Sequence, residues 1–431
     1  YKLNLYPRNT LLAPPLSQEV LAENEAFWDQ ADREVLQRLG AAAMLSAEPK
    51  QRTLDRWLAQ AHLPSDPNAD AAILASFYSR ALDFWGVQLQ KADHLPQAAA
   101  RFERALNLNP DNLVAQINLE YNGNLRTKRK ASVQLSQSIE DQFGKYRNWD
   151  QIVGANGPFD EPSFCYEQGR AFARSGNYRQ AAHEFTRVKK LAPDNLSARL
   201  YLAQISLLSQ MPDAALQEVQ TIQADLASAC QTNFIELLSI QTSAHLVKND
   251  PDGAKAVVQK ALTTYPTNTD LLATFAQVYM NFGHYSNALE ILERQIKVQP
   301  NSPEALINKG FACLQMKAYQ QAITPLTLAL SLETNNTSDT YYRALFNRAI
   351  AYLQSDNRDN LDKAQQDYEV LQKAFTNAFR VYYGLGEIAY RKTNNAAAIK
   401  NYQLYLANAQ TNTEEATNVL ARLAELKRRS P

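Results

Sequence analysis

Apolar residues along most of the chain are spaced three and four positions apart, within stretches of roughly 12–15 residues separated by short polar turns. This spacing places the apolar side chains on one face of an α-helix, whereas a strand would show strict alternation. The stretches come in pairs, and a proline or asparagine often closes the second member, as at Pro266 and Pro300. The pattern predicts an all-α protein built from helix-turn-helix units.

These units repeat along the chain with a period of 34 residues. Gly310, Tyr319, Ala322 and Leu326 have counterparts 34 positions earlier at Ala276, Tyr285, Ala288 and Leu292. The small residue that opens the second helix of each unit marks nine units: Ala98, Ala131, Ala181, Ala215, Ala254, Ala288, Ala322, Ala364 and Ala398. Periods of this length are typical of solenoids, in which each unit packs only on its neighbours. The sequence therefore predicts an α-solenoid of about nine repeats.

The repeat resembles the tetratricopeptide repeat (TPR) family, whose 34-residue unit has small residues where its two helices cross and a proline near its end. The strongest units, at residues 79–112, 162–195 and 379–412, have a glycine at that crossing. The unit at residues 113–145 is the weakest, because it lacks the closing proline. The resemblance implies a right-handed superhelix whose first helices line an inner, concave face.

Departures from the period divide the chain into segments. Residues 77–412 form the expected repeat array, and a surplus over two full periods places an inserted loop at residues 144–160. Residues 1–76 are expected to be a helical N-terminal extension with a proline-rich lead. Residues 413–431 are expected to be a capping helix, with an acidic start and a basic end that suit the helix dipole. Two helices are expected in the extension, at residues 19–39 and 49–63.

Composition narrows the choice of fold and partner. Only 13 of the 431 residues are glycine, under half of the roughly 7% usual in proteins, which disfavours propellers and barrels. The 44 Lys and Arg balance 44 Asp and Glu, so no overall basic field favours a nucleic acid partner. No apolar run approaches the ~18 residues of a membrane span. The three cysteines form no CxxC pair: Cys165, Cys230 and Cys313.

Motifs of catalysis and cofactor binding are missing from the sequence. It contains no GxGxxG after a strand, no P-loop, no HExxH and no GxSxG. Its five histidines fall in different repeat units, which does not favour a shared metal site. We therefore expect no enzyme activity from this region, no catalytic residues, no metal and no cofactor.

The sixth position of each unit lies on the first helix, and the TPR resemblance implies that it points into the concave groove. Three units have asparagine there: Asn118, Asn308 and Asn347. The other units have Phe84, Glu167, Tyr201, Ile240, Thr274 and Gly384. A side-chain amide is both donor and acceptor, so it can bind a peptide main chain without reading its side chains. We predict that the asparagines contact a partner; a plain polar lining of the groove is the alternative interpretation.

Tyrosine and arginine side chains also gather on the first helices. Tyr166, Arg170 and Arg174 lie beside the insertion, and Tyr383, Tyr390 and Arg391 lie near the C-terminal end. Both residue types anchor protein interfaces, because they are large and can hydrogen-bond while packed. We predict that these six residues also contact a partner, and ordinary packing between repeats is the alternative.

The first residues, YKLNLYPRNTLLAPPLSQEVLAENEAFW, carry a second resemblance. They look like the stretch after the last membrane span in bacterial membrane proteins related to protein O-mannosyltransferases, several of which continue into TPR arrays. This implies a soluble C-terminal acceptor- or partner-recognition region of a membrane glycosyltransferase-like protein. The chain begins at Tyr1, so we expect a processed product or a piece of a longer protein. Its place would then be extracytoplasmic or membrane-associated, and otherwise cytoplasmic.

The sequence as a whole predicts a scaffold that binds an extended peptide or protein partner in the concave groove of a TPR superhelix. Affinity would come from many modest contacts along the ligand. A general scaffold predicts binding without turnover, whereas the glycosyltransferase-like alternative predicts membrane spans upstream. A standalone enzyme would need a clustered acid and base set, which the sequence does not show.

Overall fold

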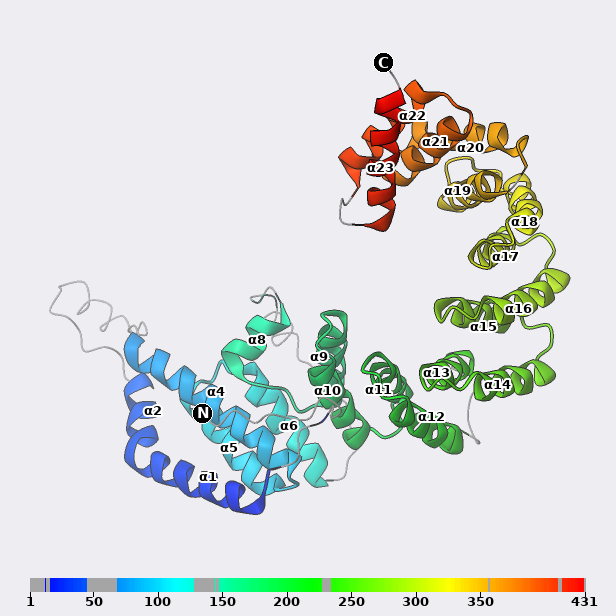
Figure 1. Ribbon diagram of the computed structural model, residues 1–431. Helices are drawn as coiled ribbons and strands as arrows, with labels where there is room; N and C mark the ends of the chain where they lie inside the picture. Colours follow the sequence, from blue (N-terminus) through cyan, green and yellow to red (C-terminus); the bar gives the residue numbers. More distant parts are fainter. Residues whose placement is uncertain are drawn as a thin grey trace. The chain divides into compact units, whose positions relative to one another are not determined.

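The computed structural model describes residues 12, 16–44, 68–127, 144, 146, 148–226, 234–355, 357–409 and 413–429. Across these residues the secondary structure is helical and contains no strand, which confirms the predicted all-α class (Figure 1). The chain divides into two compact units, Tyr1–Ala229 and Cys230–Pro431. Each unit is a stack of helix pairs, the α-solenoid architecture that the 34-residue period predicts. No helix in the described part is both long and apolar enough to cross a bilayer.

The helices of the first unit follow the predicted units closely. They are α1 (Gln18–Ala31), a π-helical turn (Asp32–Leu36), α2 (Gln37–Met44), α4 (Ala69–Lys91), α5 (Leu95–Leu108), α6 (Leu113–Thr127), α8 (Trp149–Asn156), α9 (Pro162–Arg174), α10 (Tyr178–Leu191), α11 (Leu196–Leu208) and α12 (Pro212–Leu226). The pairs α4/α5, α9/α10 and α11/α12 are antiparallel hairpins. The weak unit contributes α6, and its expected second helix lies outside the described residues.

The second unit is the more regular of the two. Its helices are α13 (Phe234–Val247), α14 (Pro251–Thr264), α15 (Thr269–Asn281), α16 (Tyr285–Val298), α17 (Pro303–Gln315), α18 (Tyr319–Leu332), α19 (Asp339–Gln354), α20 (Asn360–Ala374), α21 (Phe379–Arg391), α22 (Asn395–Asn408) and α23 (Glu414–Arg429). Odd-numbered α13 to α21 are the first helices of five successive pairs, and each pairs with the helix that follows it. The lone α23 follows the last pair.

Glycine at the helix crossing lets the two helices of a pair approach closely, as the sequence predicts. A Cβ built on Gly86 would lie 2.5 Å from the ring of Phe102, and one on Gly386 would lie 2.6 Å from the ring of Tyr402. Both rings are fully buried. A side chain at either position would therefore force the helices apart.

Most pairs share one type of tight turn between their helices. The third turn residue donates its main-chain N–H to a carbonyl five residues earlier, for example His284 to Tyr279 at 2.9 Å and Ala318 to Cys313 at 2.9 Å. This is the bond of a Schellman motif, which needs a residue with positive φ just before the donor. Glycine fills that place at Gly176 and Gly283. The remaining turns have other residues with φ between 58° and 64°: Asp93, Gln210, Asn249, Lys317 and Thr393.

The N-terminal extension packs against the first repeat pair. The helix expected at residues 19–39 is present and runs on to Met44 through the π-helical turn. Trp28 and Leu36 are buried against α4 and α5. The Trp85 indole N–H donates to Glu25 at 2.6 Å, and Arg101 pairs with the same carboxylate at 3.0 Å. The helix expected at residues 49–63 lies beyond what the structure describes, as does most of the proline-rich lead.

The insertion expected as a loop at residues 144–160 instead contains the helix α8. Asn148 begins this helix, because its side chain accepts the main-chain N–H of Gln151 at 3.0 Å. Ile152 and Phe159 then pack on α6 in an apolar cluster. The loop prediction was wrong because it relied on glycine content and could not see the apolar face that α6 offers.

The helix α23 covers the end of the second unit. Its Val419, Leu423 and Leu426 are buried against the tyrosines of α22. Glu387 of α21 is 4% exposed and accepts a hydrogen bond from the Tyr402 hydroxyl at 2.6 Å. The same carboxylate pairs with Arg422 of α23, whose guanidinium lies 5.0 Å from the Tyr390 ring centroid. A half-buried ion pair and a cation–π contact therefore hold α23 against α21.

Candidate functional site

The second unit has a cavity of about 420 Å³ over the first helices of three successive pairs, α15, α17 and α19. Its lining residues are Gln277, Met280, Asn281, Tyr285, Asn308, Phe311, Arg343, Phe346 and Asn347. All but Tyr285 come from first helices. The cavity therefore lies on the helix face that the repeat pattern assigns to the groove. We call these nine residues the asparagine groove.

Two of the three predicted asparagines meet in this cavity. Asn308 and Asn347 occupy equivalent positions on α17 and α19, so the stacking of consecutive pairs brings them to one surface. Both side chains are partly buried. Within the described part of the chain, neither amide has a hydrogen-bond partner. Each amide thus keeps its donor and acceptor available for a ligand.

Aromatic rings form the apolar walls beside these amides. Phe311 packs edge-on against Tyr285, with 6.3 Å between ring centroids. Phe346 packs edge-on against Tyr368, with 6.2 Å between centroids. Both phenylalanines remain partly exposed. The edge contacts fix the orientation of the rings, so the groove offers preformed apolar surface for a ligand side chain.

Arg343 supplies the positive charge of the groove. Its guanidinium pairs with Glu304 at 3.0 Å, and both side chains are about half exposed. Exposed pairs of this kind contribute about 0–1 kcal/mol, so a ligand carboxylate can replace Glu304 at little cost. Near the other end, Gln277 donates to Asn281 at 2.7 Å. The groove therefore combines two amides without internal partners, apolar walls and one positive charge in an exposed ion pair.

The third asparagine does not belong to any groove. Asn118 is fully buried in the first unit. Its amide N–H groups donate to Asp83 and to the Pro158 carbonyl, both at 2.9 Å, and its oxygen accepts from the Asp160 main chain at 2.8 Å. The prediction that Asn118 contacts a partner is wrong, because the insertion folds over it and uses all its hydrogen-bonding groups.

Asn118 is part of a buried polar network that joins the insertion to α4, α6 and α10. Arg187 makes two contacts of 2.6 Å with the Asp160 carboxylate, and Gln90 donates to that carboxylate at 2.8 Å. Asp83 is fully buried, and one of its oxygens has no partner among the described residues. Burial, with a further contribution from the charge of Asp160, raises the pKa of Asp83 well above its ordinary value.

The residues predicted beside the insertion are partly committed to internal contacts. The Tyr166 ring packs edge-on against Phe185 and Tyr201, with centroids 5.8 Å and 6.0 Å away. Arg170 pairs with Glu167 at 2.9 Å and lies over the Tyr166 ring. Arg174 is exposed at the end of α9. Contact of Tyr166, Arg170 and Arg174 with a partner stays a prediction.

The predicted residues near the C-terminal end also take part in packing. Tyr383 packs on Tyr405 with 5.7 Å between centroids, and burial raises the pKa of Tyr383. Tyr390 lies under Arg422 of the capping helix. Arg391 donates to the Leu353 carbonyl at 2.6 Å, although it is exposed. These contacts agree with the packing alternative, and a partner-binding role for Tyr383, Tyr390 and Arg391 stays a prediction.

The sixth position of the repeat is not uniformly open. Phe84 is 53% exposed, whereas Ile240 is buried at 4%. Gly384 is also buried, with the Tyr368 ring directly over its Cα. Sequence reasoning missed the other seven residues of the asparagine groove, which include Phe311, Arg343 and Phe346. Helical spacing from the asparagines could have found two of them. Phe311 is three residues after Asn308, and Arg343 is four residues before Asn347, so each lies on the same helix face as its asparagine.

The described residues hold no group of three or more His, Cys, Asp or Glu side chains placed to bind a metal ion. Cys165 and Cys313 are both buried. Burial raises the pKa of each thiol, which keeps it in the unreactive protonated form at neutral pH.

Comparison with known families finds matches for two segments of the helix array. Residues 166–228 and 247–307 each match a model of the tetratricopeptide repeat. These two segments are therefore similar to tetratricopeptide repeats. The first match begins within α9 and runs through α12. The second match runs through α14, α15 and α16 into α17 and ends at Ile307, the residue before Asn308. In other proteins, tetratricopeptide repeats present extended surfaces for binding.

The individual relatives that this chain resembles are distant. The Protein SGT1 homolog of Oryza sativa subsp. japonica is 27% identical over 103 residues, which are 24% of this chain and 28% of the relative. Cellulose synthase operon protein C of Pseudomonas fluorescens (strain SBW25) is 25% identical over 239 residues, 50% of this chain and 18% of the relative. The chain thus spans less than a third of the length of either curated relative.

Solved tetratricopeptide repeat structures superpose only loosely. A tetratricopeptide repeat protein from Parabacteroides merdae ATCC 43184 is 15% identical, with 61% of this chain and 98% of that chain covered and a TM-score of 0.41. MamA is 26% identical, with 39% and 93% covered and a TM-score of 0.33.

Proposed function

We propose that this chain is a protein-interaction scaffold that binds an extended polypeptide in the asparagine groove. Asn308 and Asn347 would hold the ligand main chain, and one apolar ligand side chain would lie between Phe311 and Phe346. The observation that carries the proposal is the pair of partly buried amides without internal partners, set between aromatic walls. Such amides bind a main chain whatever the ligand's side chains are.

The groups of the groove suggest moderate affinity with some selectivity. A typical hydrogen bond contributes about 1 kcal/mol net, because the free ligand also bonds to water. Burying an apolar ligand side chain adds about 1.5–3 kcal/mol. Arg343 favours a ligand with an acidic residue, since exchanging Glu304 costs little. We therefore expect an extended ligand with one apolar and one acidic side chain.

A displayed library of random peptides, selected on the whole protein, provides ligands for the test. Peptides that also bind the double variant Asn308→Ala, Asn347→Ala are removed by counter-selection. Titration calorimetry then compares the wild type with each single variant, and we expect each substitution to weaken binding about ten-fold, or about 1.4 kcal/mol. Asn336→Ala is the matched control, because Asn336 is exposed in the turn before α19.

The outcome is clear in either direction. Loss of binding in the asparagine variants, with circular dichroism unchanged and Asn336→Ala binding normally, supports the proposal. A selected peptide whose affinity is the same for the wild type and for a folded double variant contradicts it. Failure to select any groove-dependent peptide contradicts it as well.

The alternative function, recognition of an acceptor for a membrane glycosyltransferase-like protein, rests on the resemblance of the first residues alone. It differs from the general scaffold in what must precede this chain in its gene. An upstream reading frame that encodes about ten or more apolar spans, each of ~20 residues, would favour it. An upstream frame without such spans would remove it and leave the peptide-binding proposal intact.

A further inference from the structure

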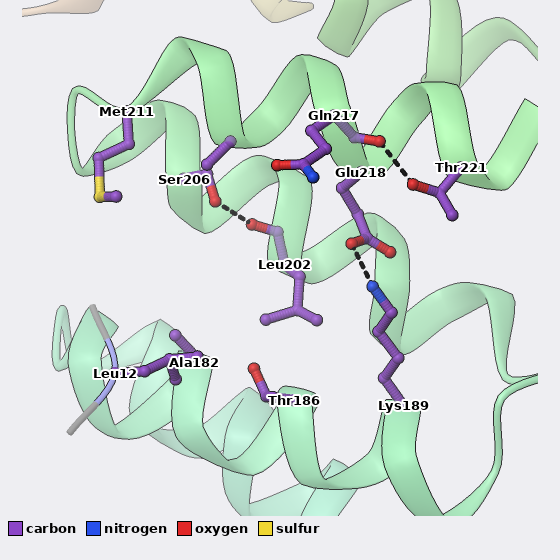
Figure 2. A pocket seen from close by; sticks show the side chains of 11 residues that line it. Leu12, Ala182, Thr186, Lys189, Leu202, Ser206, Met211, Gln217, Glu218 and Thr221 are labelled. Atoms are coloured by element: carbon purple, nitrogen blue, oxygen red, sulfur yellow. Dashed lines mark hydrogen bonds and ion pairs between the residues drawn. The ribbon is translucent and has the colours of Figure 1, made fainter. Parts of the chain in front are cut away.

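A second cavity lies in the first unit, on helices that the asparagine groove does not use. Its volume is about 470 Å³, and it lies between the second helices α10 and α12, over the first helix α11. Figure 2 shows the side chains of α10 and α12 on opposite sides, with Leu202 and Ser206 of α11 between them. We call this cavity the outer-helix groove. It is the larger of the two cavities described here.

One end of the outer-helix groove is apolar and is occupied by this chain's own Leu12. Leu12 lies next to Ala182 of α10 in Figure 2, and Leu202, Met211 and Ala214 complete this end. Leu12 is 44% exposed, so more than half of its surface is covered. A leucine 170 residues away in sequence from Ala182 therefore supplies part of the wall of a cavity built by the third and fourth repeat pairs.

The other end of the groove is closed by charged groups that are already paired. Lys189 of α10 contacts Glu218 of α12 at 2.6 Å, and Arg199 contacts the same carboxylate at 3.0 Å. These pairs tie the two sides of the groove together. A ligand would gain little by competing for Glu218, because removing one partner of such a pair leaves the other charge unpaired.

Two of the three hydroxyl groups in the lining, those of Ser206 and Thr221, form hydrogen bonds within their own helices. Ser206 donates to the Leu202 carbonyl at 2.8 Å, and Thr221 donates to the Gln217 carbonyl at 2.6 Å. With these donors spent on their own helices, the free surface of the groove is mainly apolar. Its chemistry therefore favours an apolar side chain over a polar one.

We propose that the outer-helix groove is a binding site for an extended apolar peptide segment and that its resident ligand is the N-terminal lead of the same chain, anchored by Leu12. Two prolines, Pro14 and Pro15, follow Leu12 in the sequence. Proline-rich peptides are preorganised in an extended form and lose little backbone freedom on binding. The ligand class is thus a leucine followed closely by prolines.

Occupation by the same chain has a consequence for competitors. A tethered ligand acts at an effective concentration in the millimolar range, so a free peptide of similar affinity competes poorly. Removing the Leu12 side chain should open the groove to such a peptide. This site is separate from the asparagine groove, so its test does not depend on the proposed function.

The first test measures a fluorescent peptide with the sequence of residues 7–18 binding to the full chain by anisotropy. We expect Leu12→Ala to bind the peptide at least about ten-fold more tightly than the wild type, because the tethered competitor is lost. Leu16→Ala is the matched control: Leu16 is 42% exposed in the same lead but does not line the groove. It should bind the peptide no better than the wild type.

A second pair of variants tests whether the peptide binds in the outer-helix groove. Ala214 lines it on α12, whereas Ala224 is exposed elsewhere on the same helix. In the Leu12→Ala background, Ala214→Arg should abolish peptide binding, and Ala224→Arg should not. Equal peptide binding by the wild type and Leu12→Ala, or full binding by the folded Ala214→Arg variant, would overturn the proposal.

Cross-linking tests whether the resident ligand comes from the same chain. The full chain with Cys230→Ser, Leu12→Cys and Met211→Cys is treated with a short bis-maleimide, since Cys165 and Cys313 are buried. We expect a link between positions 12 and 211 at the mass of a single chain. The matched Leu16→Cys variant should link much less. Links found only in dimers, or equal linking by the two variants, would contradict occupation by the same chain.

Discussion

At the scale of single residues, the turn inside each helix pair places a residue in the left-handed region. Lys317 has φ of 59° there, while Gly283 fills the same place one repeat earlier with φ of 77°. A residue with a Cβ is strained in this region, and the strain costs roughly 1–2 kcal/mol. Glycine has no Cβ and adopts the same conformation without strain. The Schellman hydrogen bond therefore forms even in turns where the residue with positive φ is not glycine.

Exchanging the turn residues should change stability in opposite directions. We expect Lys317→Gly to raise the free energy of unfolding by about 1 kcal/mol and Gly283→Ala to lower it by about 1 kcal/mol. Urea unfolding followed by circular dichroism measures both. Lys317→Ala is the control for loss of the lysine side chain and should change little. A stabilising Gly283→Ala would contradict this account of the turn.

The buried carboxyl of Asp83 should make stability depend on pH. Its pKa is raised in the folded protein, so folding takes up a proton between the ordinary pKa near 3.8 and the raised value. Stability contributed by Asp83 is full below the ordinary pKa and falls as the pH rises through this window. Asp83→Asn removes the titration. The melting temperature of Asp83→Asn minus that of the wild type should therefore increase from about pH 4 to about pH 7; a constant difference would refute the raised pKa.

At the scale of helices, the effect of a glycine on stability depends on whether it lies at a helix crossing or elsewhere in the helix. Gly86 on α4 faces the Phe102 ring at the crossing. Among the residues that the structure describes, no atom from outside its own helix lies within 4 Å of a Cβ built on Gly123 of α6. The first glycine allows close packing. The second only weakens its helix, by about 1 kcal/mol relative to alanine.

The same substitution at these two glycines should therefore have opposite effects. We expect Gly123→Ala to stabilise the protein by up to about 1 kcal/mol. Gly86→Ala should destabilise it by about 1–3 kcal/mol, because the buried Phe102 ring must shift. Thermal unfolding of the two variants, measured side by side, tests this. Equal melting temperatures would show that the crossing at Gly86 tolerates a side chain.

Sequence reasoning succeeded where a feature recurs within one period. Gly86 and Gly386 were identified as crossing residues because the residues that face them belong to the same 34-residue unit. The same reasoning placed Asn308 and Asn347 on one face, which is where the cavity lies. It failed for Asn118, whose surroundings come from the insertion, because a segment outside the period can fold onto any neighbouring helix.

At the scale of the whole chain, the stability of a repeat array is approximately a sum of terms from each repeat and from its contacts with neighbours. The contacts of this chain follow that pattern, since each helix packs mainly on the helices nearest in sequence. The exceptions are the long-range contacts of the lead, the insertion and the N-terminal extension, all in the first unit. None of these contacts could be read from the repeat period.

A destabilising change in the second unit should therefore remain local. Gly310→Val would displace Leu326 at the crossing of α17 and α18. We expect faster amide hydrogen exchange in α15 to α19 and unchanged exchange in α4 to α6 of the first unit. Mass spectrometry of peptic fragments reports both regions at once. Faster exchange throughout the chain would show that the two units unfold as one.

The helix α23 covers apolar surface of the last helix pair in the second unit. Its Val419, Leu423 and Leu426 occupy the apolar surface on which a further helix pair would otherwise pack. If α23 were detached, that surface would be open to a second molecule. A contact between the end of one molecule and a different surface of the next does not close on itself and leads to filaments. The ion pair of Glu387 with Arg422 helps to hold α23 over this surface, so we expect variants that break it to favour filament formation.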